Sequence, residues 1–202
     1  MRWQLRQIDY YFAPMSPFTY LAGSGLEEIA ARHDCAIRYV PLDAPALFPR
    51  TGGQALADRH PVRKEYRLQE LRRQAKKRGV PLNMQPSFFP VNPAPASYAI
   101  IAAAKAGGGD LAGLVQSLPR AVWVEDRNIA EDEVVKDLLA RHGFDPSVAD
   151  RYMLAAAETY ANNLEEAVSR GVFGVPFYIV GDERFWGQDR LDDLDLYLAG
   201  KL

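Results

Sequence analysis

Segments that favour β-strands occur only near the two ends of this chain. Close to the start, "IDYYFA" (residues 8–13) and "AIRYVPL" (residues 36–42) are rich in β-branched and aromatic residues, and a proline closes each of them. Between them, beginning at Pro17, apolar residues recur at near-helical spacing at Phe18, Leu21, Leu26 and Ile29. Two strands joined by one helix pair in parallel through a right-handed crossover. The chain is therefore predicted to open with a β-α-β unit.

The end of the chain returns to strands. "PFYIV" and "ERFWG" flank Gly181 and Asp182, a pair typical of a hairpin turn, and "DRLDDLDLYLAG" predicts a closing amphipathic helix. The middle is predicted to contain a loop over residues 41–58, a basic helix over 60–78, and further helices over 94–106, 110–123, 131–141 and 146–170. This order predicts an α/β, thioredoxin-like fold with an inserted all-helical domain. We place the thioredoxin-like domain at residues 1–45 and 165–202, and the insertion at 46–164.

The composition of the chain mainly excludes certain partners and certain kinds of site. A net charge of -2 argues against nucleic acid as a partner. No apolar run approaches the roughly 20 residues of a membrane span, and no signal segment is visible, so we expect a cytoplasmic protein without a membrane partner. The single cysteine, Cys35, excludes an intrachain disulfide, and the scattered histidines have no metal-ligand spacing, so no metal site is predicted.

The basic helix over residues 60–78 has two interpretations. Residues 59–78 hold nine of the 24 basic residues of the chain and only two acidic ones, Glu65 and Glu70. Such a helix is most often a solvated face. The alternative is a local electric field that attracts dianionic substrates.

Two runs carry a resemblance to a known family: "SPFTYLAG" at residues 16–23 and "GVFGVPFYIVGDERFWGQDRL" at residues 171–191. The chain resembles the 2-hydroxychromene-2-carboxylate isomerases and, more widely, the kappa-class glutathione transferases of the DsbA-like branch. The resemblance spans nearly the whole chain, with further matches at "GVPLNMQPSFFP" and "RAVWVEDRNIAEDEVV". DsbA-like oxidoreductases carry Cys-Pro-X-Cys where this chain has Ser16, Pro17, Phe18 and Thr19. Thiol–disulfide exchange is therefore unavailable to it.

The resemblance implies a catalytic role for Ser16, which would hold and activate the sulfur of glutathione. The residue alone suggests a simpler role, because a serine before a helix is commonly its N-cap. A free thiol has a pKa of about 8.5, and lowering that pKa by about two units requires roughly 2.7 kcal/mol of preference for the thiolate. One charge-assisted hydrogen bond and a helix N-terminus can supply this preference.

Further glutathione contacts follow from the resemblance. Val175 would offer its backbone N–H and C=O to the cysteine of glutathione, beside a cis peptide bond to Pro176. The family segment that binds the γ-glutamyl end of glutathione aligns with Trp186, Gly187, Gln188 and Asp189. Asp189 would pair with the ammonium group of that end, or else act as a helix cap.

The loop before the basic helix departs from the family, which commonly places a lysine there to reach the glycine carboxylate of glutathione. In "LFPRTGG" the aligned position is Phe48 or its neighbour Pro49, and Arg50 is a candidate replacement for the lysine. Asp58 and Arg59 align approximately with another pair that contacts the peptide.

The leading hypothesis is a glutathione-dependent cis-trans isomerase. By resemblance it would interconvert 2-hydroxychromene-2-carboxylate and trans-o-hydroxybenzylidenepyruvate, or act on a related aromatic catabolite. Phe88 and Asn92 are predicted to line the pocket for this aromatic substrate, although phenylalanines are as often core residues. A kappa-class-like transferase or peroxidase, and a thioredoxin-like binding protein without turnover, remain open. The resemblance also implies a homodimer.

Overall fold

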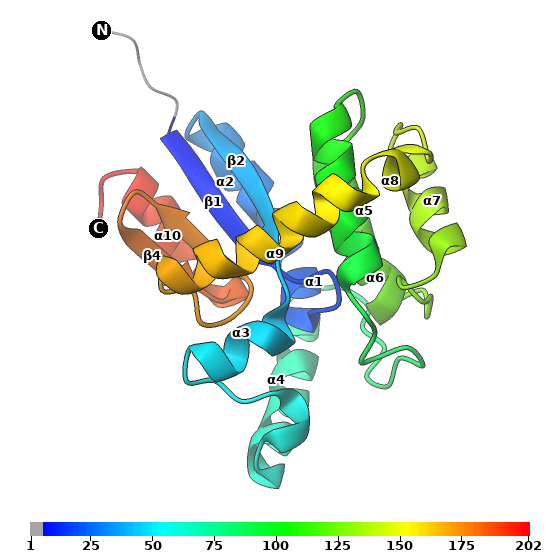
Figure 1. The fold of residues 1–202 in the computed structure, drawn as a ribbon. Coiled ribbons are helices and arrows are strands. Elements are labelled where there is room, and N and C mark those ends of the chain that lie inside the picture. The colour runs from blue at the N-terminus through cyan, green and yellow to red at the C-terminus, as the bar shows by residue number, and fades with distance from the viewer. Residues whose placement is uncertain (1–5) are drawn as a thin grey trace, which may run out of the picture.

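The described part of the chain, residues 6–202 of a computed structural model, contains one four-stranded sheet. Its strands are β1 (Arg6–Phe12), β2 (Cys35–Pro41), β3 (Phe177–Val180) and β4 (Glu183–Trp186). The order in the sheet is β2-β1-β3-β4 (Figure 1). β1 runs parallel to β2, whereas β3 is antiparallel to both β1 and β4. The predicted β-α-β opening, the closing hairpin and the thioredoxin-like class are therefore confirmed.

Helices and short 3-10 segments make up most of the rest. They are α1 (Pro17–Ala22), α2 (Gly25–Arg32), α3 (Ala44–Arg50), η1 (Leu56–Asp58), α4 (Pro61–Arg78), α5 (Ala94–Ala106), α6 (Leu111–Trp123), α7 (Asp132–Arg141), α8 (Val148–Arg151), α9 (Met153–Ser169), η2 (Gln188–Arg190) and α10 (Leu191–Leu198). Within residues 6–202, none of these helices is long and apolar enough to cross a membrane.

The helices depart from the sequence-based expectations at a few boundaries. The helix expected after Pro17 is two helices, because Gly23 adopts φ 58° and ends α1. The predicted loop over 41–58 contains α3 and η1. Asp43 starts α3 by accepting a hydrogen bond from the Ala46 N–H at 3.1 Å. The helix expected over 146–170 is interrupted at Tyr152, between α8 and α9.

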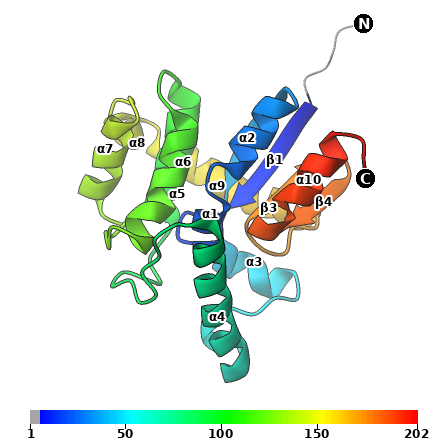
Figure 2. The same cartoon turned by 180° about the vertical axis from the view of Figure 1, so that it is seen from behind.

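Alternate residues of β1 face opposite sides of the sheet. Ile8, Tyr10 and Phe12 belong to a buried cluster that also contains apolar residues of α2 and α10. Tyr11 lies on the other face, in a cluster with residues of α3 and α9. Figures 1 and 2 show the same layers, with α9 crossing one face and α2 and α10 covering the other. Full burial of each such aromatic side chain contributes about 1.5–3 kcal/mol.

The helical segment shares its core with the sheet. Ile100 of α5, Leu118 of α6 and Leu139 of α7 lie in the same buried cluster as Phe12. α9 runs through residue 164 and contacts both α5 and β2. The proposed domain boundaries at 45/46 and 164/165 stay a prediction.

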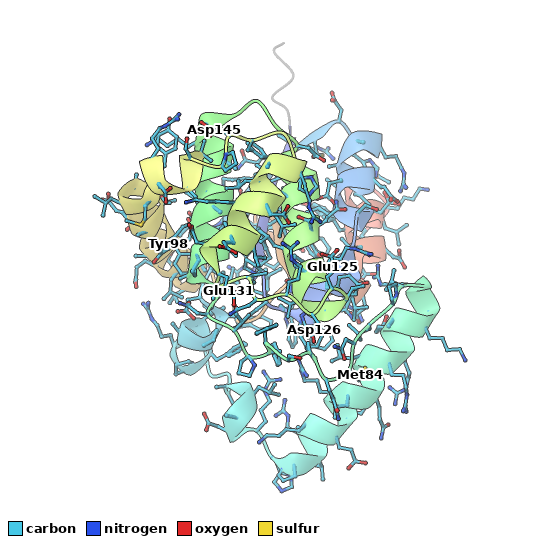
Figure 3. All side chains as sticks on the ribbon, turned by 90° about the vertical axis from the view of Figure 1, so that its right-hand side faces the viewer. Met84, Tyr98, Glu125, Asp126, Glu131 and Asp145 are labelled. Carbon is cyan, nitrogen blue, oxygen red and sulfur yellow. The ribbon has the colours of Figure 1, made fainter. Side chains whose placement is uncertain are left out.

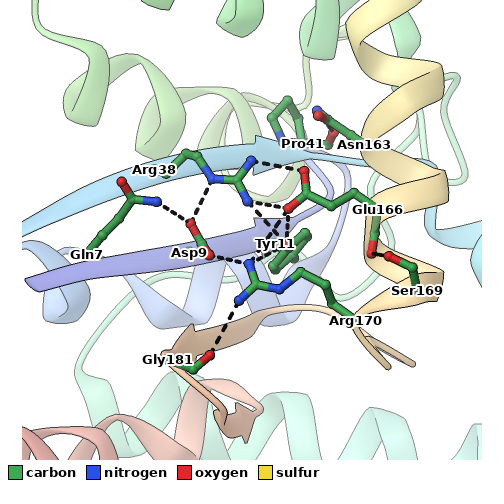
Figure 4. Close-up of polar contacts among 10 residues, drawn as sticks. All are labelled: Gln7, Asp9, Tyr11, Arg38, Pro41, Asn163, Glu166, Ser169, Arg170 and Gly181. Atoms are coloured by element: carbon green, nitrogen blue, oxygen red, sulfur yellow. Dashed lines mark hydrogen bonds and ion pairs between the residues drawn. The ribbon is translucent and has the colours of Figure 1, made fainter.

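A network of charged side chains joins the sheet to α9 (Figure 4). Asp9 of β1 is 7% exposed and accepts hydrogen bonds from Arg38 of β2, at 2.7 Å, and from Arg170 just after α9. Arg38 also pairs with Glu166 of α9, which accepts the Tyr11 hydroxyl at 2.5 Å. The network therefore fixes α9 across the face of β1 and β2.

Candidate active site

The turn between β1 and α1 positions Ser16. Its N–H donates to the Ala13 carbonyl at 2.9 Å, and its side chain is the N-cap of α1, accepting from the Thr19 N–H at 3.4 Å. Ser16 is 8% exposed. The hydroxyl oxygen accepts a hydrogen bond in the cap, and its own O–H is still able to donate one. The capping role and a role at a thiolate are therefore compatible.

Thr19, at the position of the second cysteine in the oxidoreductase motif, adds a second hydroxyl to this turn. Its Oγ1 is buried and has no hydrogen-bond partner within the part of the chain that the structure describes. A buried hydroxyl without a partner costs about 1–3 kcal/mol. A polar group of a ligand bound at this turn would remove that cost.

Val175 lies opposite the same turn. β1 and β3 pair Tyr11 with Phe177, and continuing this antiparallel register by two residues places Ala13 opposite Val175. The bond between Val175 and Pro176 is cis. The backbone N–H and C=O of Val175 take part in no hydrogen bond among residues 6–202. They are free to pair with an extended peptide, as β-strand addition requires.

A pocket of about 380 Å³ brings together part of the predicted set. Its lining includes Phe48, Arg59, Arg63, Phe173 and Trp186, with a stretch of loop from Thr51 to Gln54. The Trp186 and Phe173 rings pack edge to face, with centroids 4.8 Å apart. Arg59 lies over the Phe48 ring, 5.5 Å from its centroid. Phe48, Arg59 and Trp186 therefore share one site.

The charges at this pocket favour an anion. Burial, followed by the charge of Arg63, lowers the pKa of Arg59. The Arg59 Nε–H donates to the Gln54 carbonyl at 3.0 Å, and no carboxylate among residues 6–202 pairs with it. A carboxylate of a ligand would relieve the repulsion between the two arginines.

Gln188 and Asp189 line a different pocket, of about 310 Å³, with residues of α2, α4 and α10. The segment η2 that holds them packs against α1. The Gln188 carbonyl accepts from Arg78 at 2.6 Å, and Asp189 pairs with Arg190 at 3.0 Å. Gly187 adopts φ 113°, which turns the chain between this pocket and Trp186. Their assignment to the γ-glutamyl end stays a prediction.

The other predicted residues lie outside these pockets. Arg50 pairs with both carboxylate oxygens of Glu165, at 2.5 and 2.9 Å. Asp58 is exposed in η1. Phe88 is 38% exposed, and the Asn92 side chain accepts from the Ala94 N–H at 3.1 Å. None of these four lines either pocket, and their roles stay predictions.

Several residues of these sites were not predicted from the sequence. Arg63 and Phe173 line the pocket beside Trp186. Trp123 touches the Ser16 turn directly, since its Nε1 donates to the Met15 carbonyl at 3.0 Å. Trp123 lies in "RAVWVEDRNIAEDEVV", one of the runs that carried the resemblance, and that membership is the signal that pointed to it.

Gly174→Ala should displace the Trp186 ring while changing the free energy of unfolding by only about 1 kcal/mol. An added Cβ would overlap the indole nitrogen of Trp186, and the ring, which is 53% exposed, has room to move. The expected readout is a change in tryptophan fluorescence. In a Trp186→Phe background the same substitution should leave the emission unchanged, and a change that persists there would contradict the contact.

Comparison with known proteins identifies the family. The sequence pattern of the DSBA-like thioredoxin domain matches residues 7–199. The chain belongs to the DSBA-like thioredoxin domain family. This membership agrees with the β2-β1-β3-β4 sheet and with the helices that separate its two halves.

Individual relatives confirm the resemblance to the 2-hydroxychromene-2-carboxylate isomerases. A 2-hydroxychromene-2-carboxylate isomerase of Sphingobium xenophagum is 32% identical over 197 residues, which cover 96% of this chain and 98% of that protein. One of Pseudomonas putida is 33% identical over 189 residues, covering 91% and 90%. A solved structure of such an isomerase has a TM-score of 0.77 at 30% identity, covering 96% and 95%.

A solved disulfide reductase shares the fold. The cytosolic disulfide reductase DsbM from Pseudomonas aeruginosa has a TM-score of 0.69 at 20% identity, covering 96% of this chain and 98% of its own. At that identity the likeness supports the architecture alone. The turn of the present chain carries Ser16 and Thr19 in place of the two motif cysteines.

Proposed function

We propose that this protein is a glutathione-dependent cis-trans isomerase that interconverts 2-hydroxychromene-2-carboxylate and trans-o-hydroxybenzylidenepyruvate, or a related aromatic catabolite. The observation that carries the proposal is similarity along nearly the whole chain to three isomerases of that name, at 31–33% identity. The geometry of the Ser16 turn supports the glutathione requirement independently.

The residues around this turn fit glutathione. The Thr19 hydroxyl is buried without a partner in the described chain, and the backbone groups of Val175 are unpaired there. Arg59 and Arg63 supply positive charge to the neighbouring pocket. A tripeptide with a thiol and two carboxylates matches these three features: a polar atom at the turn, an extended backbone, and an anionic end.

Glutathione, when bound, supplies a thiol that adds to a conjugated carbon and later leaves it, so that the former double bond can rotate in between. Ser16 would donate its hydroxyl proton in a hydrogen bond to the thiolate, which lowers the pKa of the thiol without consuming the serine. Val175 would fix the peptide beside the turn. Phe173 and Trp186 would offer exposed aromatic surface to the peptide.

An isomerase of this kind needs glutathione but does not consume it. We expect no turnover without glutathione, and with it we expect many turnovers while the titratable thiol stays constant. The thiol is both the attacking and the leaving group, so a thiolate of moderate basicity serves both steps. Product formation is followed by absorbance, and free thiol is titrated at intervals.

The rival functions give different results in the same assay. Loss of one thiol per product would assign the protein as a transferase. Measurable glutathione affinity without any reaction would assign it as a binding protein. Full turnover in the absence of glutathione would contradict the proposed role of the cofactor.

A further inference from the structure

A third pocket, of about 390 Å³, lies beside the Ser16 turn on the side of α4. It is lined by Leu56, Lys64, Arg67, Leu68, Leu71, Met84, Gln85, Pro86, Phe89 and Trp123. In Figure 3, Met84 marks the loop of this pocket next to α4. The walls are mostly apolar and include two aromatic rings, as in pockets that hold small organic molecules.

The face that α4 turns toward this pocket carries two cations beside its apolar residues. Lys64, Arg67, Leu68 and Leu71 follow the i, i+3, i+4, i+7 spacing of one helical face. Leu71 is 1% exposed and packs against the core. Leu68 on the same face is 46% exposed, and Arg67 is partly buried beside it.

Arg67 has no anionic partner in the part of the chain that the structure describes. It forms no ion pair and no hydrogen bond with any side chain or carbonyl in residues 6–202. Its guanidinium lies over two rings, 5.9 Å from the centroid of Phe18 and 5.6 Å from that of Phe89. Burial, followed by the charge of Arg59, lowers the pKa of Arg67 to about 10. A partly desolvated guanidinium without an acceptor favours a bound anion.

The pocket adjoins the turn on both sides of Ser16. Trp123, in its wall, donates to the carbonyl of Met15, and Phe18 lies under the Arg67 guanidinium. The loop that closes the pocket is tied to the end of α6. The Ser87 N–H and hydroxyl donate to Asp126 at 2.7 and 2.6 Å (Asp126 is labelled in Figure 3).

We propose that this pocket binds a flat aromatic carboxylate, with Arg67 as the residue that selects the carboxylate and with Phe89 and Trp123 as walls for the ring. The choice of substrate class rests on the proposed function. Phe89 and Trp123 pack against each other with centroids 4.7 Å apart. Arg67 lines the same pocket, and the N–H donors of its planar guanidinium match the two oxygens of a carboxylate.

The test compares an acid with its neutral amide on two proteins, without glutathione and without turnover. Binding of trans-cinnamate and of trans-cinnamamide is measured by calorimetry on the wild type and on Arg67→Gln. We expect the wild type to prefer the acid and Arg67→Gln to lose about tenfold in affinity for it, as the loss of one charge-assisted pair predicts. Affinity for the amide should change by less than about twofold, because the ring walls remain.

Arg72→Gln is the matched control, because Arg72 is exposed on the same helix and its loss changes the net charge equally. It should bind both compounds as the wild type does. A wild type that binds neither compound, or an Arg67→Gln that retains the preference for the acid, would overturn the proposal. Equal losses for acid and amide would show that Arg67 only supports the pocket walls, and this too would overturn it.

A second measurement needs no variant. A crystal of the wild type soaked with trans-cinnamate should place the carboxylate at ion-pair distance from the Arg67 guanidinium, and a carboxylate located elsewhere would refute the assignment. These experiments are independent of the isomerase assay. If the assay fails while Arg67 still selects the acid, the proposed function falls and the pocket assignment stands.

Discussion

Ser16→Ala should lower kcat by about ten- to a hundredfold while the protein still folds. A hydrogen bond to a charged group is worth about 1.5–3 kcal/mol. Its loss would raise the pKa of the thiol of bound glutathione and lower the thiolate fraction at neutral pH. The cost in stability should be small, about 0.5 kcal/mol, because the capping contact to the Thr19 N–H is long, at 3.4 Å. Turnover is measured across pH, and the thiolate of bound glutathione by ultraviolet absorbance.

The pH dependence separates this role from simple loss of binding. In Ser16→Ala the rate should recover as the pH rises through the higher thiol pKa, and the affinity for glutathione should stay within a few-fold. Ser24→Ala is the control, since the Ser24 hydroxyl donates to Glu28 at 2.6 Å at the exposed start of α2. Wild-type turnover of Ser16→Ala at neutral pH would show that Ser16 takes no part in the mechanism.

The sequence predicted those parts of the fold that local patterns determine. The strands of "IDYYFA" and "PFYIV", the hairpin at Gly181 and Asp182, and the helix over 94–106 all depend on spacing and turn residues within a few positions. The parallel pairing of β1 with β2 follows from the short helical connection between them. These features needed no knowledge of distant contacts.

The misplaced boundaries had local causes that competed with stronger patterns. The prolines and glycines of residues 41–58 suggested a loop, yet Pro45 is compatible with the first turn of a helix, and Asp43 caps that helix. The apolar spacing from Phe18 to Ile29 suggested one helix, and the positive φ of Gly23 breaks it. In both places one or two residues outweighed the pattern of the surrounding segment.

The site was predictable only where it follows the family motifs. Ser16, Val175 and Trp186 lie in quoted runs, and the structure gives each a defined place. Arg67 belongs to a helix that is basic on several faces, so its sequence position alone does not distinguish it from Arg72. What distinguishes it is a contact with Phe18 and Phe89, which lie on separate segments. Such a pairing of distant segments is a tertiary property.

We expect the largest loss of stability from a substitution in the charged network between the sheet and α9. Asp9→Asn should lower the free energy of unfolding by about 2 kcal/mol, because it removes the one buried anion of the network and leaves Arg170, which is partly exposed, with Glu166 at 3.7 Å as its remaining anionic partner in residues 6–202. Arg38 would keep its ion pair with Glu166 and its hydrogen bond to the Tyr11 hydroxyl. The measurement is urea denaturation, with a lower midpoint and an unchanged m-value expected. Asp182→Asn, in the exposed turn between β3 and β4, should change stability by less than about 0.5 kcal/mol.

The same network makes the stability of the fold depend on pH. Burial alone would raise the pKa of Asp9, but hydrogen bonds from Arg38, Arg170 and Gln7 outweigh it, and the pKa is lowered. The pKa of Glu166 is also lowered, chiefly by its hydrogen bond with Arg38. A carboxyl group whose pKa is lower in the folded state contributes stability above its unfolded pKa, about 4, and loses it as the pH falls through the folded pKa.

The wild type should therefore lose stability steeply in acid, and Asp9→Asn should lose less over the same range, since Asp9 no longer takes up a proton there. The two stability curves should converge as the pH falls below the folded pKa of Asp9, where the wild-type carboxyl is itself neutral. Parallel curves would show that Asp9 contributes nothing to the acid sensitivity. A variant as stable as the wild type at neutral pH would show that the buried charges cancel their own desolvation cost, and that packing against α9 alone holds the sheet face.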